Sequence, residues 1–237
     1  MVGRQLAAAG LWRGIVSWMQ VLPGIREIPL RRVRAHLLVE DQLTLVDAGP
    51  PGSGPAIERA IRAVGRQPGE LVRIVCTHGH PDHAGGAREL SGPGVEVRLH
   101  RADREAIRVR LRDVPRRPSL GRFFAALTPP LDDARPLDDG DVLPVLGGLE
   151  VIHVPGHTAG SVCLYGRRDG ILFVGDALEA RRGRVTYASR RYSDDPRAAR
   201  LAVKRLASLR VETVVFSHYP PLREGAERVL AELARHA

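Results

Sequence analysis

The stretch Thr77-His78-Gly79-His80-Pro81-Asp82-His83 places four side chains of metal-binding type within six positions. Histidines two positions apart in an extended or turning segment can bind one ion together. Pro81 interrupts regular structure in the middle of the stretch, which allows Asp82 and His83 to turn toward a second ion. Imidazole and carboxylate ligands with no thiolate nearby suit zinc, iron or manganese, and they suit a catalytic site better than a structural one.

Four other apolar runs of the chain also end in a histidine or a carboxylate. The runs have the composition of buried strands, and the carboxyl end of a strand is where an α/β sheet presents its ligands. A single histidine beside a strand is most often structural, but this many ligand-type residues at strand ends indicate one shared site. The four residues are Asp47, His157, Asp176 and His218.

Short β-branched runs and helical periodicity alternate along the chain, which predicts an α/β sandwich. Helices are expected from Ser53-Gly54-Pro55, from Asp195-Pro196 and from about Glu224, where start signals precede apolar residues at helical spacing. The expected strands are 35–39, 43–47, 72–77, 95–99, 149–154, 162–165, 171–174 and 213–217.

The domain organisation follows from where these elements lie. Residues 25–237 are expected to form one domain, and residues 1–24 an N-terminal extension. Residues 101–141 are rich in Arg, Pro and Asp, and a connection this long in a compact domain is usually a lid or a disordered excursion. Phe123 and Phe124 lie in its one apolar island and are candidates to cover an acyl pocket, although such aromatics more often anchor a lid.

Composition excludes several classes of protein. The chain has 237 residues and a formal net charge of +9, and of its 36 Lys and Arg residues only Lys204 is a lysine. A GC-rich genome also produces this skew, so a nucleic-acid partner is not expected. No run approaches the roughly 18–20 apolar residues that cross a bilayer, and no cleavage-site pattern follows the apolar N-terminal stretch. We therefore expect a cytoplasmic protein without a membrane anchor.

The motifs THGHPDHAGG (77–86), VPGHTAGS (154–161), VGDAL (174–178) and FSH (216–218), in this order and spacing, resemble the metallo-β-lactamase superfamily of hydrolases. The resemblance extends from Ile28 to the C-terminus, and it implies an αββα sandwich with a metal site at one edge of its two sheets. It departs from the family in two places. The last histidine usually stands in a Gly-His-Gly setting and here lies between Ser217 and Tyr219, and residues 1–24 are an extension that the family does not require.

The same resemblance implies a role for each candidate residue. Asp176 would bridge two ions, and Asp47 would orient a metal-binding histidine. One ion would be held by His78, His80 and His157, and the other by Asp82, His83 and His218. The cofactor expected is two divalent ions, with zinc first and iron or manganese as alternatives.

Two divalent ions that share a carboxylate would lie ~3.5–4 Å apart and hold a water whose pKa falls from roughly 15.7 to about 7. The resulting hydroxide attacks a carbonyl carbon or a phosphorus, so no side-chain nucleophile is needed. Asp82 and Asp176 are the residues expected to take part in catalysis, and Asp82 could also accept a proton from the water.

The residue at the bridging position limits the class of substrate. An aspartate there resembles the thioesterase, lactonase and ribonuclease branches, which favours a thioester or a lactone over a phosphodiester and indicates a glyoxalase II-like or lactonase-like hydrolase. Tyr187 and Tyr192 are candidates to contact the substrate oxygen. Arg182 lies in an Arg-rich run that could bind an anionic small molecule or could be a solvated surface.

Two alternatives stay open at the level of sequence. A persulfide dioxygenase-like oxidoreductase would use one iron held by His78, His157 and Asp176. An RNA-processing hydrolase of the same fold would use the Arg-rich segments, and its binding would depend steeply on salt. The substrate, the physiological metal and the oligomeric state are not determined by the sequence.

Overall fold

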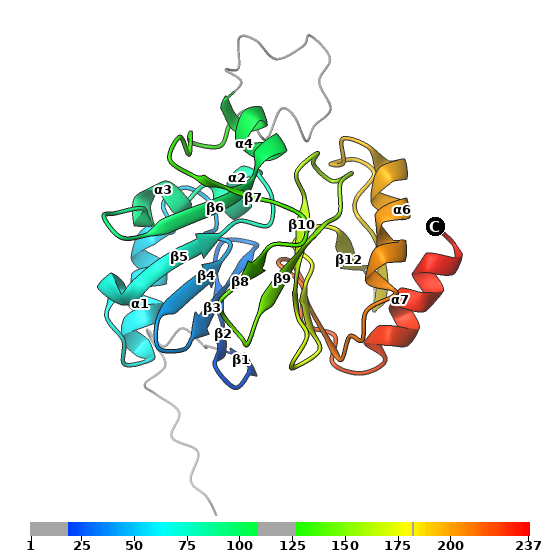
Figure 1. Ribbon diagram of the computed structural model, residues 1–237, viewed down its shortest axis with the longest axis horizontal. Helices are drawn as coiled ribbons and strands as arrows, with labels where there is room; N and C mark the ends of the chain where they lie inside the picture. Colours follow the sequence, from blue (N-terminus) through cyan, green and yellow to red (C-terminus); the bar gives the residue numbers. More distant parts are fainter. Residues whose placement is uncertain (1–18, 109–126, 182) are drawn as a thin grey trace, which may run out of the picture.

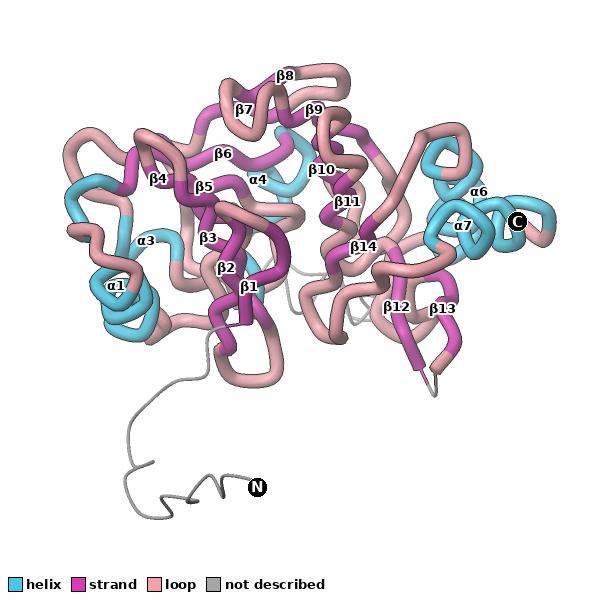
Figure 2. Tube along the Cα trace, turned by 90° about the horizontal axis from the view of Figure 1, so that it is seen from below, coloured by secondary structure: helices cyan, strands magenta, loops and turns pink. Residues whose placement is uncertain are grey.

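Two β-sheets pack face to face, and helices cover both outer faces (Figure 1). The structure is a computed structural model that describes residues 19–108, 127–181 and 183–237. Helices α1 and α3 lie against one sheet, and α6 and α7 lie against the other (Figures 1 and 2). This αββα order confirms the sandwich predicted from the sequence.

The first sheet has seven strands in chain order, and its middle strands position half of the candidate site. β4 is parallel to β5, and β5 is parallel to β6, so the carboxyl ends of these three strands lie at one edge. The seven strands are β1 (Met19–Leu22), β2 (Ile25–Pro29), β3 (Arg34–Val39), β4 (Leu43–Val46), β5 (Leu71–Val75), β6 (Glu96–His100) and β7 (Arg135–Leu137).

The second sheet has the strand order β14-β11-β10-β9-β8. β10 is antiparallel to β9 and to β11, and β14 is parallel to β11, so β9, β11 and β14 all point the same way. A separate hairpin pairs β12 (Leu178–Arg181) with β13 (Arg184–Tyr187). The five strands of the sheet are β8 (Val142–Leu143), β9 (Leu149–His153), β10 (Val162–Gly166), β11 (Ile171–Phe173) and β14 (Thr213–Val215).

The helices begin where the sequence supplies start signals. Asp195 precedes α6, and its Oδ1 accepts hydrogen bonds from the backbone N–H groups of Arg197 and Ala198, both at 2.9 Å. Such a cap satisfies N–H groups that have no partner within the helix. Among the described residues, the helices are α1 (Gly54–Ala63), α2 (Pro81–Ala84), α3 (Ala87–Leu90), α4 (Arg101–Arg108), α6 (Pro196–Leu206) and α7 (Ala226–Arg235), with a 3-10 turn, η1 (Pro68–Glu70).

Alternation along the central strands divides the core into three layers. In β3, Leu37 packs beneath the helices of the first sheet, whereas the next residue, Leu38, packs between the two sheets. In β10, Leu164 packs between the sheets, whereas Tyr165 packs with the residues under α6 and α7. Strands buried on both faces read as continuous apolar runs, which is why the sequence reveals them.

Each of the eight predicted strands is present within one or two residues of its expected bounds. The first sheet begins at Met19, inside the range expected as an extension, and the segment 101–141 contains α4 and β7. Phe123, Phe124 and Arg182 lie outside the described residues, so their predicted roles stay predictions. In the part of the chain that is described, no helix has the length and apolar character to span a membrane.

Candidate metal centre

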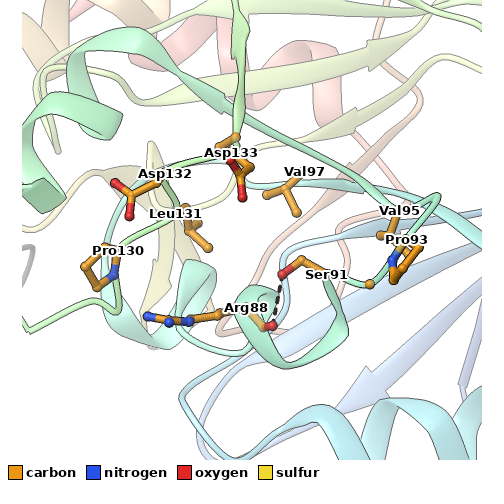
Figure 3. Close-up of a pocket in the computed structure, with 11 residues that line it drawn as sticks. Arg88, Ser91, Pro93, Val95, Val97, Pro130, Leu131, Asp132 and Asp133 are labelled. Atoms are coloured by element: carbon orange, nitrogen blue, oxygen red, sulfur yellow. Dashed lines mark hydrogen bonds between the residues drawn. The ribbon is translucent and has the colours of Figure 1, made fainter.

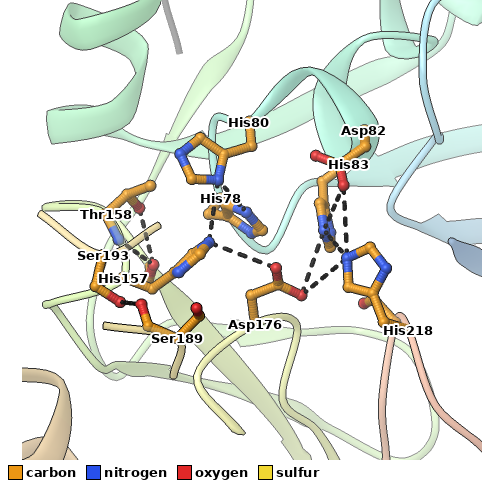
Figure 4. A network of polar contacts seen from close by, with 12 residues as sticks. His78, His80, Asp82, His83, His157, Thr158, Asp176, Ser189, Ser193 and His218 are labelled. Carbon is orange, nitrogen blue, oxygen red and sulfur yellow. Dashed lines mark hydrogen bonds and ion pairs between the residues drawn. The ribbon is translucent and has the colours of Figure 1, made fainter. Parts of the chain in front are cut away.

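The predicted ligands meet at one edge of the sandwich, where both sheets present the carboxyl ends of strands (Figure 4). Pro81 begins α2 directly after His80, so the short helix turns Asp82 and His83 back toward the edge. Because β9, β11 and β14 run in one direction, the loops that follow them reach the same place. Those loops contribute His157, Asp176 and His218, respectively.

The first set of ligand atoms consists of three imidazole nitrogens. His80 Nδ1 lies 3.1 Å from His78 Nε2 and 3.0 Å from His157 Nε2. All three side chains are buried, at 1% exposure for His78, 5% for His80 and 3% for His157. The three nitrogens therefore converge on one point in a region shielded from solvent.

The second set combines one carboxylate with two imidazoles. His83 Nε2 lies 3.3 Å from His218 Nε2, and Asp82 Oδ2 lies 3.5 Å from His218 Nε2 and 3.8 Å from His83 Nε2. The His83 side chain is fully buried, but that of Asp82 is 43% exposed and that of His218 is 25% exposed. This set therefore opens toward solvent.

Asp176 lies between the two sets and offers one oxygen to each. Its Oδ2 lies 3.5 Å from His157 Nε2, and its Oδ1 lies 3.5 Å from His83 Nε2 and 3.3 Å from His218 Nε2. Ligand atoms bound tetrahedrally to zinc at 2.0–2.1 Å are separated by about 3.3–3.4 Å. The observed separations fit two ions bridged by one carboxylate.

Asp47 fixes the orientation of His83 from behind. Its Oδ2 lies 2.8 Å from His83 Nδ1, which leaves His83 Nε2 facing the second set. The backbone N–H of Thr77 donates to Asp47 Oδ1 at 2.8 Å, and the Ser217 hydroxyl donates to Oδ2 at 3.2 Å. The carboxylate thus joins β4 to the residues that precede His78 and His218, in the position expected for an acid that orients a ligand.

Burial and charge give the two sets opposite electrostatic character. Burial lowers the pKa of His78 well below its usual value, and it lowers the pKa of His157 to about 3. Burial also lowers the pKa of His83, but the charges of the surrounding carboxylates, Asp176 first, outweigh it and raise the pKa to about 10. Burial thus favours the neutral form of all three imidazoles of the first set, which is the form whose lone pairs can bind an ion.

A cleft of about 450 Å³ adjoins both ligand sets and the bridging carboxylate, because His80 and His157 line it as well as Asp82 and His218. Its walls include Arg32, Arg181, Tyr192 and Tyr219. Tyr187 lies elsewhere, because it packs on α7 and donates its hydroxyl hydrogen to the carbonyl oxygen of Leu233. Of the two candidate tyrosines, the structure brings only Tyr192 to the site.

A second hollow of about 500 Å³ lies between the end of α3 and residues 130–134 (Figure 3). Its walls carry Arg88, Ser91 and the adjacent acids Asp132 and Asp133. None of the ligand-type residues at strand ends lines it, so the chemistry is concentrated in the first cleft.

Sequence reasoning missed two residues that border the centre. Arg32, in the turn between β2 and β3, has a φ of 61° and accepts a hydrogen bond from His218 Nδ1 on its carbonyl oxygen, at 2.6 Å. Asp103, in α4, receives hydrogen bonds from the loops that carry His78, His80 and His157. Asp103 also follows a buried strand, β6, so its place at a strand end was a signal that could have found it.

Comparison with known proteins identifies the superfamily of this chain. The sequence pattern of the Metallo-beta-lactamase superfamily matches residues 29–218, which is most of the chain. The chain belongs to this superfamily. A metallo-beta-lactamase family protein from Thermus thermophilus has the same fold, with a TM-score of 0.68 and 25% identity over 92% of this chain and 80% of that chain. A B3 metallo-beta-lactamase superimposes with a TM-score of 0.71 at 22% identity, over 92% of this chain and 87% of that one, which shows the fold alone.

The curated relatives of this chain include proteins that are named as a hydrolase and as a thioesterase. The hydroxyacylglutathione hydrolase of Aeromonas hydrophila is 33% identical over 179 residues, which are 75% of this chain and 56% of the relative. The acyl-coenzyme A thioesterase MBLAC2 of Gallus gallus is 36% identical over 170 residues, which are 65% of this chain and 50% of the relative. The chain thus matches 50% and 56% of the length of these two relatives.

Proposed function

We propose that this superfamily member is a hydrolase with two divalent ions, zinc first among them, that cleaves a small thioester. The observation that carries the proposal is the position of Asp176, whose two oxygens face the two ligand sets. A mononuclear iron oxidoreductase would need only His78, His157 and Asp176, and the convergence of a second set argues against that alternative.

In the proposed reaction, each residue of the centre has its own role. Two divalent ions bound here would supply an activated water at neutral pH and would polarise the substrate carbonyl. Asp176 holds both halves of the centre together, and Asp47 keeps His83 Nε2 directed at it. Asp82 is the most exposed of the carboxylates beside the cleft, so its oxygen that does not face His218 could accept a proton from water and return it to the departing thiolate.

The walls of the cleft favour a substrate with a negative charge away from the reacting bond. Arg181 is engaged by Glu179 at 2.6 Å, whereas no ion pair joins the exposed Arg32 to another described residue. Thioesters of glutathione and of coenzyme A carry carboxylates or phosphates that a guanidinium can bind. We propose that Arg32 receives such a group while the thioester carbonyl lies over Asp176.

The test combines metal analysis of the full chain with a panel of acyl-glutathione and acyl-coenzyme A thioesters, a lactone and a phosphodiester. We expect two divalent ions per chain and thioester hydrolysis that chelation abolishes and zinc restores. One iron per chain together with oxygen consumption on glutathione persulfide would overturn the proposal. Hydrolysis of the phosphodiester alone would overturn the substrate class.

The proposed role of Arg32 is tested by Arg32→Ala, with Arg59→Ala as the matched control. Arg59 is an exposed arginine of α1, so its loss changes the net charge equally without touching the cleft. Removing one charge-assisted contact should raise KM for an anionic thioester about 10-fold or more and leave kcat nearly unchanged. Equal KM values in the two variants would show that Arg32 does not bind the substrate.

A further inference from the structure

Gly79 lies between His78 and His80, and both sides of its backbone are held by buried side chains. Its N–H donates to Asp103 Oδ2 at 2.7 Å, and its carbonyl oxygen accepts from Thr128 Oγ1, also at 2.7 Å. Asp103 is 1% exposed and Thr128 is 3% exposed. The backbone that joins two candidate ligands is thereby fixed on both edges.

The same carboxylate also holds the loop that carries the third ligand of this set. Thr158, the residue after His157, donates its hydroxyl hydrogen to Asp103 Oδ2 at 2.7 Å, and Gly160 N–H donates to Oδ1 at 2.7 Å. Figure 4 shows Thr158 beside His157 on the side of the cluster away from His218. One side chain from α4 therefore connects the two loops that supply His78, His80 and His157.

The two glycines permit this approach. A Cβ on Gly160 would lie 2.7 Å from the Asp103 carboxyl carbon and 2.8 Å from its backbone nitrogen, which is closer than real contacts allow. A Cβ on Gly79 would lie 3.1 Å from Asp103 Cβ and 3.2 Å from Ile107 Cγ2. Both loops thus pack directly against α4, with no side chain between backbone and carboxylate.

The chemistry of the contact points to orientation rather than to general stability. Burial of a carboxylate costs free energy unless hydrogen bonds compensate it, and here all three donors belong to the two ligand loops. An apolar side chain would fill the space under α4 without that cost, but it could not set the positions of two backbone N–H groups. Asp103 does for this set what Asp47 does for His83, with the difference that it acts on backbone and not on imidazole.

We propose that Asp103, supported by Thr128 and Thr158, is the positioning residue for the ion held by His78, His80 and His157. This inference rests on the proposed function, because it requires that these nitrogens bind an ion. Asp103→Asn keeps the shape of the side chain, but it replaces one acceptor with an NH2 group that faces an N–H donor. The loops should then separate slightly, and the three nitrogens should lose their common focus.

The experiment measures zinc affinity in two backgrounds that each leave one set of ligands. His218→Ala leaves the set His78, His80 and His157, and His157→Ala leaves the other set. Adding Asp103→Asn should weaken zinc binding about 10–100-fold in the His218→Ala background and less than about 3-fold in the His157→Ala background. Cobalt absorption bands should change in the first background alone, because they report ligand geometry.

Two further variants separate positioning from stability. Tyr165→Phe removes a buried hydrogen bond to the Arg210 carbonyl oxygen, far from the centre, and should lower Tm without changing zinc affinity in either background. Thr158→Val keeps the carboxylate and removes the hydrogen bonds of the Thr158 hydroxyl to Asp103 Oδ2 and with Ser161 Oγ, so it should weaken zinc binding in the His218→Ala background about 3–10-fold even if Asp103→Asn does not fold.

The outcomes are distinguishable. Equal zinc affinity with and without Asp103→Asn, or with and without Thr158→Val, in the His218→Ala background would overturn the positioning role. Equal weakening in both backgrounds would also overturn it, because the effect would then be general. Failure of the unsubstituted chain to bind two ions would instead overturn the proposed function.

Discussion

The two ligand sets differ in what surrounds them more than in what they contain. His78, His80 and His157 are buried imidazoles, and the side chain that holds their loops, Asp103, reaches backbone atoms. The other set mixes imidazole with the half-exposed Asp82, and Asp47 contacts the ring of His83 directly. The first set is a more deeply buried site of nitrogen ligands, whereas the second is more exposed and includes one carboxylate.

The difference indicates how one bridging carboxylate could serve two ligand sets that differ in exposure to solvent. A buried set of imidazoles would hold an ion with little competition from water, and a more exposed set would leave a position open for water. His80 and His157 line the cleft together with Asp82 and His218, so a substrate in the cleft would meet both sets. If two ions bind as proposed, we expect the ion held by the buried set to exchange more slowly than the ion held by the exposed set.

The largest effect is expected from Asp176→Ala, because this substitution removes the carboxylate that lies between the two ligand sets. Without the bridge, both halves lose one oxygen ligand, so activity should fall roughly 10²–10³-fold and metal content should fall below two ions per chain. Turnover on the best thioester and metal analysis measure both. Asp169→Ala, in the exposed turn after β10, is the matched control. Unchanged turnover and metal content in Asp176→Ala would refute the bridge.

A smaller, one-sided effect is expected from Asp47→Asn. The amide would no longer accept all the hydrogen bonds that orient His83, so zinc affinity should fall about 10–100-fold in the His157→Ala background. In the His218→Ala background it should change little. The pattern is the reverse of that expected for Asp103→Asn, and an identical pattern for both acids would contradict the division into halves.

Much of this arrangement could be predicted because burial leaves a mark in the sequence. β10 reads as the apolar run VCLYG because it is covered on both faces, and the ligands stand out because each follows such a run. β12 and β13 were missed because they form an isolated hairpin whose residues are only partly buried and whose composition is mixed. β1 and β2 were also missed, because β1 is an edge strand and because Arg26 and Glu27 interrupt the apolar run of β2.

The contacts between loops could not be predicted from spacing along the chain. Asp103 lies 55 residues from Thr158, and His218 lies 186 residues from Arg32, so neither pair has a local pattern that reveals it. Gly79 and Gly160 looked like ordinary loop glycines, and their need for close approach is visible only when α4 is placed against them. Local periodicity determines elements, whereas such pairs depend on how the elements pack.

The smallest effect is expected for His36, a buried histidine that belongs to neither ligand set. Its protonation affects the stability of the chain, and therefore the pH range in which metal binding by the two sets can be compared. Burial lowers the pKa of His36 to about 4, and its Nε2 is buried with no hydrogen-bond partner among the described residues. Since the unfolded chain has a pKa near 6.5, it binds more protons than the folded chain between about pH 6.5 and 4, so stability falls as pH falls through that window. His36 is expected to contribute about 1 kcal/mol to the loss of stability between pH 7.5 and 5.5.

Urea unfolding of chelator-treated protein at those two pH values measures the loss, and His36→Leu should reduce it because the variant has no proton to bind there. Leu fits the site, since His36 packs edge-on against Phe173 between the sheets. Wild type and variant with the same pH dependence would show that other groups control acid unfolding. The zinc affinities of the two ligand sets would then be compared at pH 7 or above, so that acid unfolding is not mistaken for metal loss.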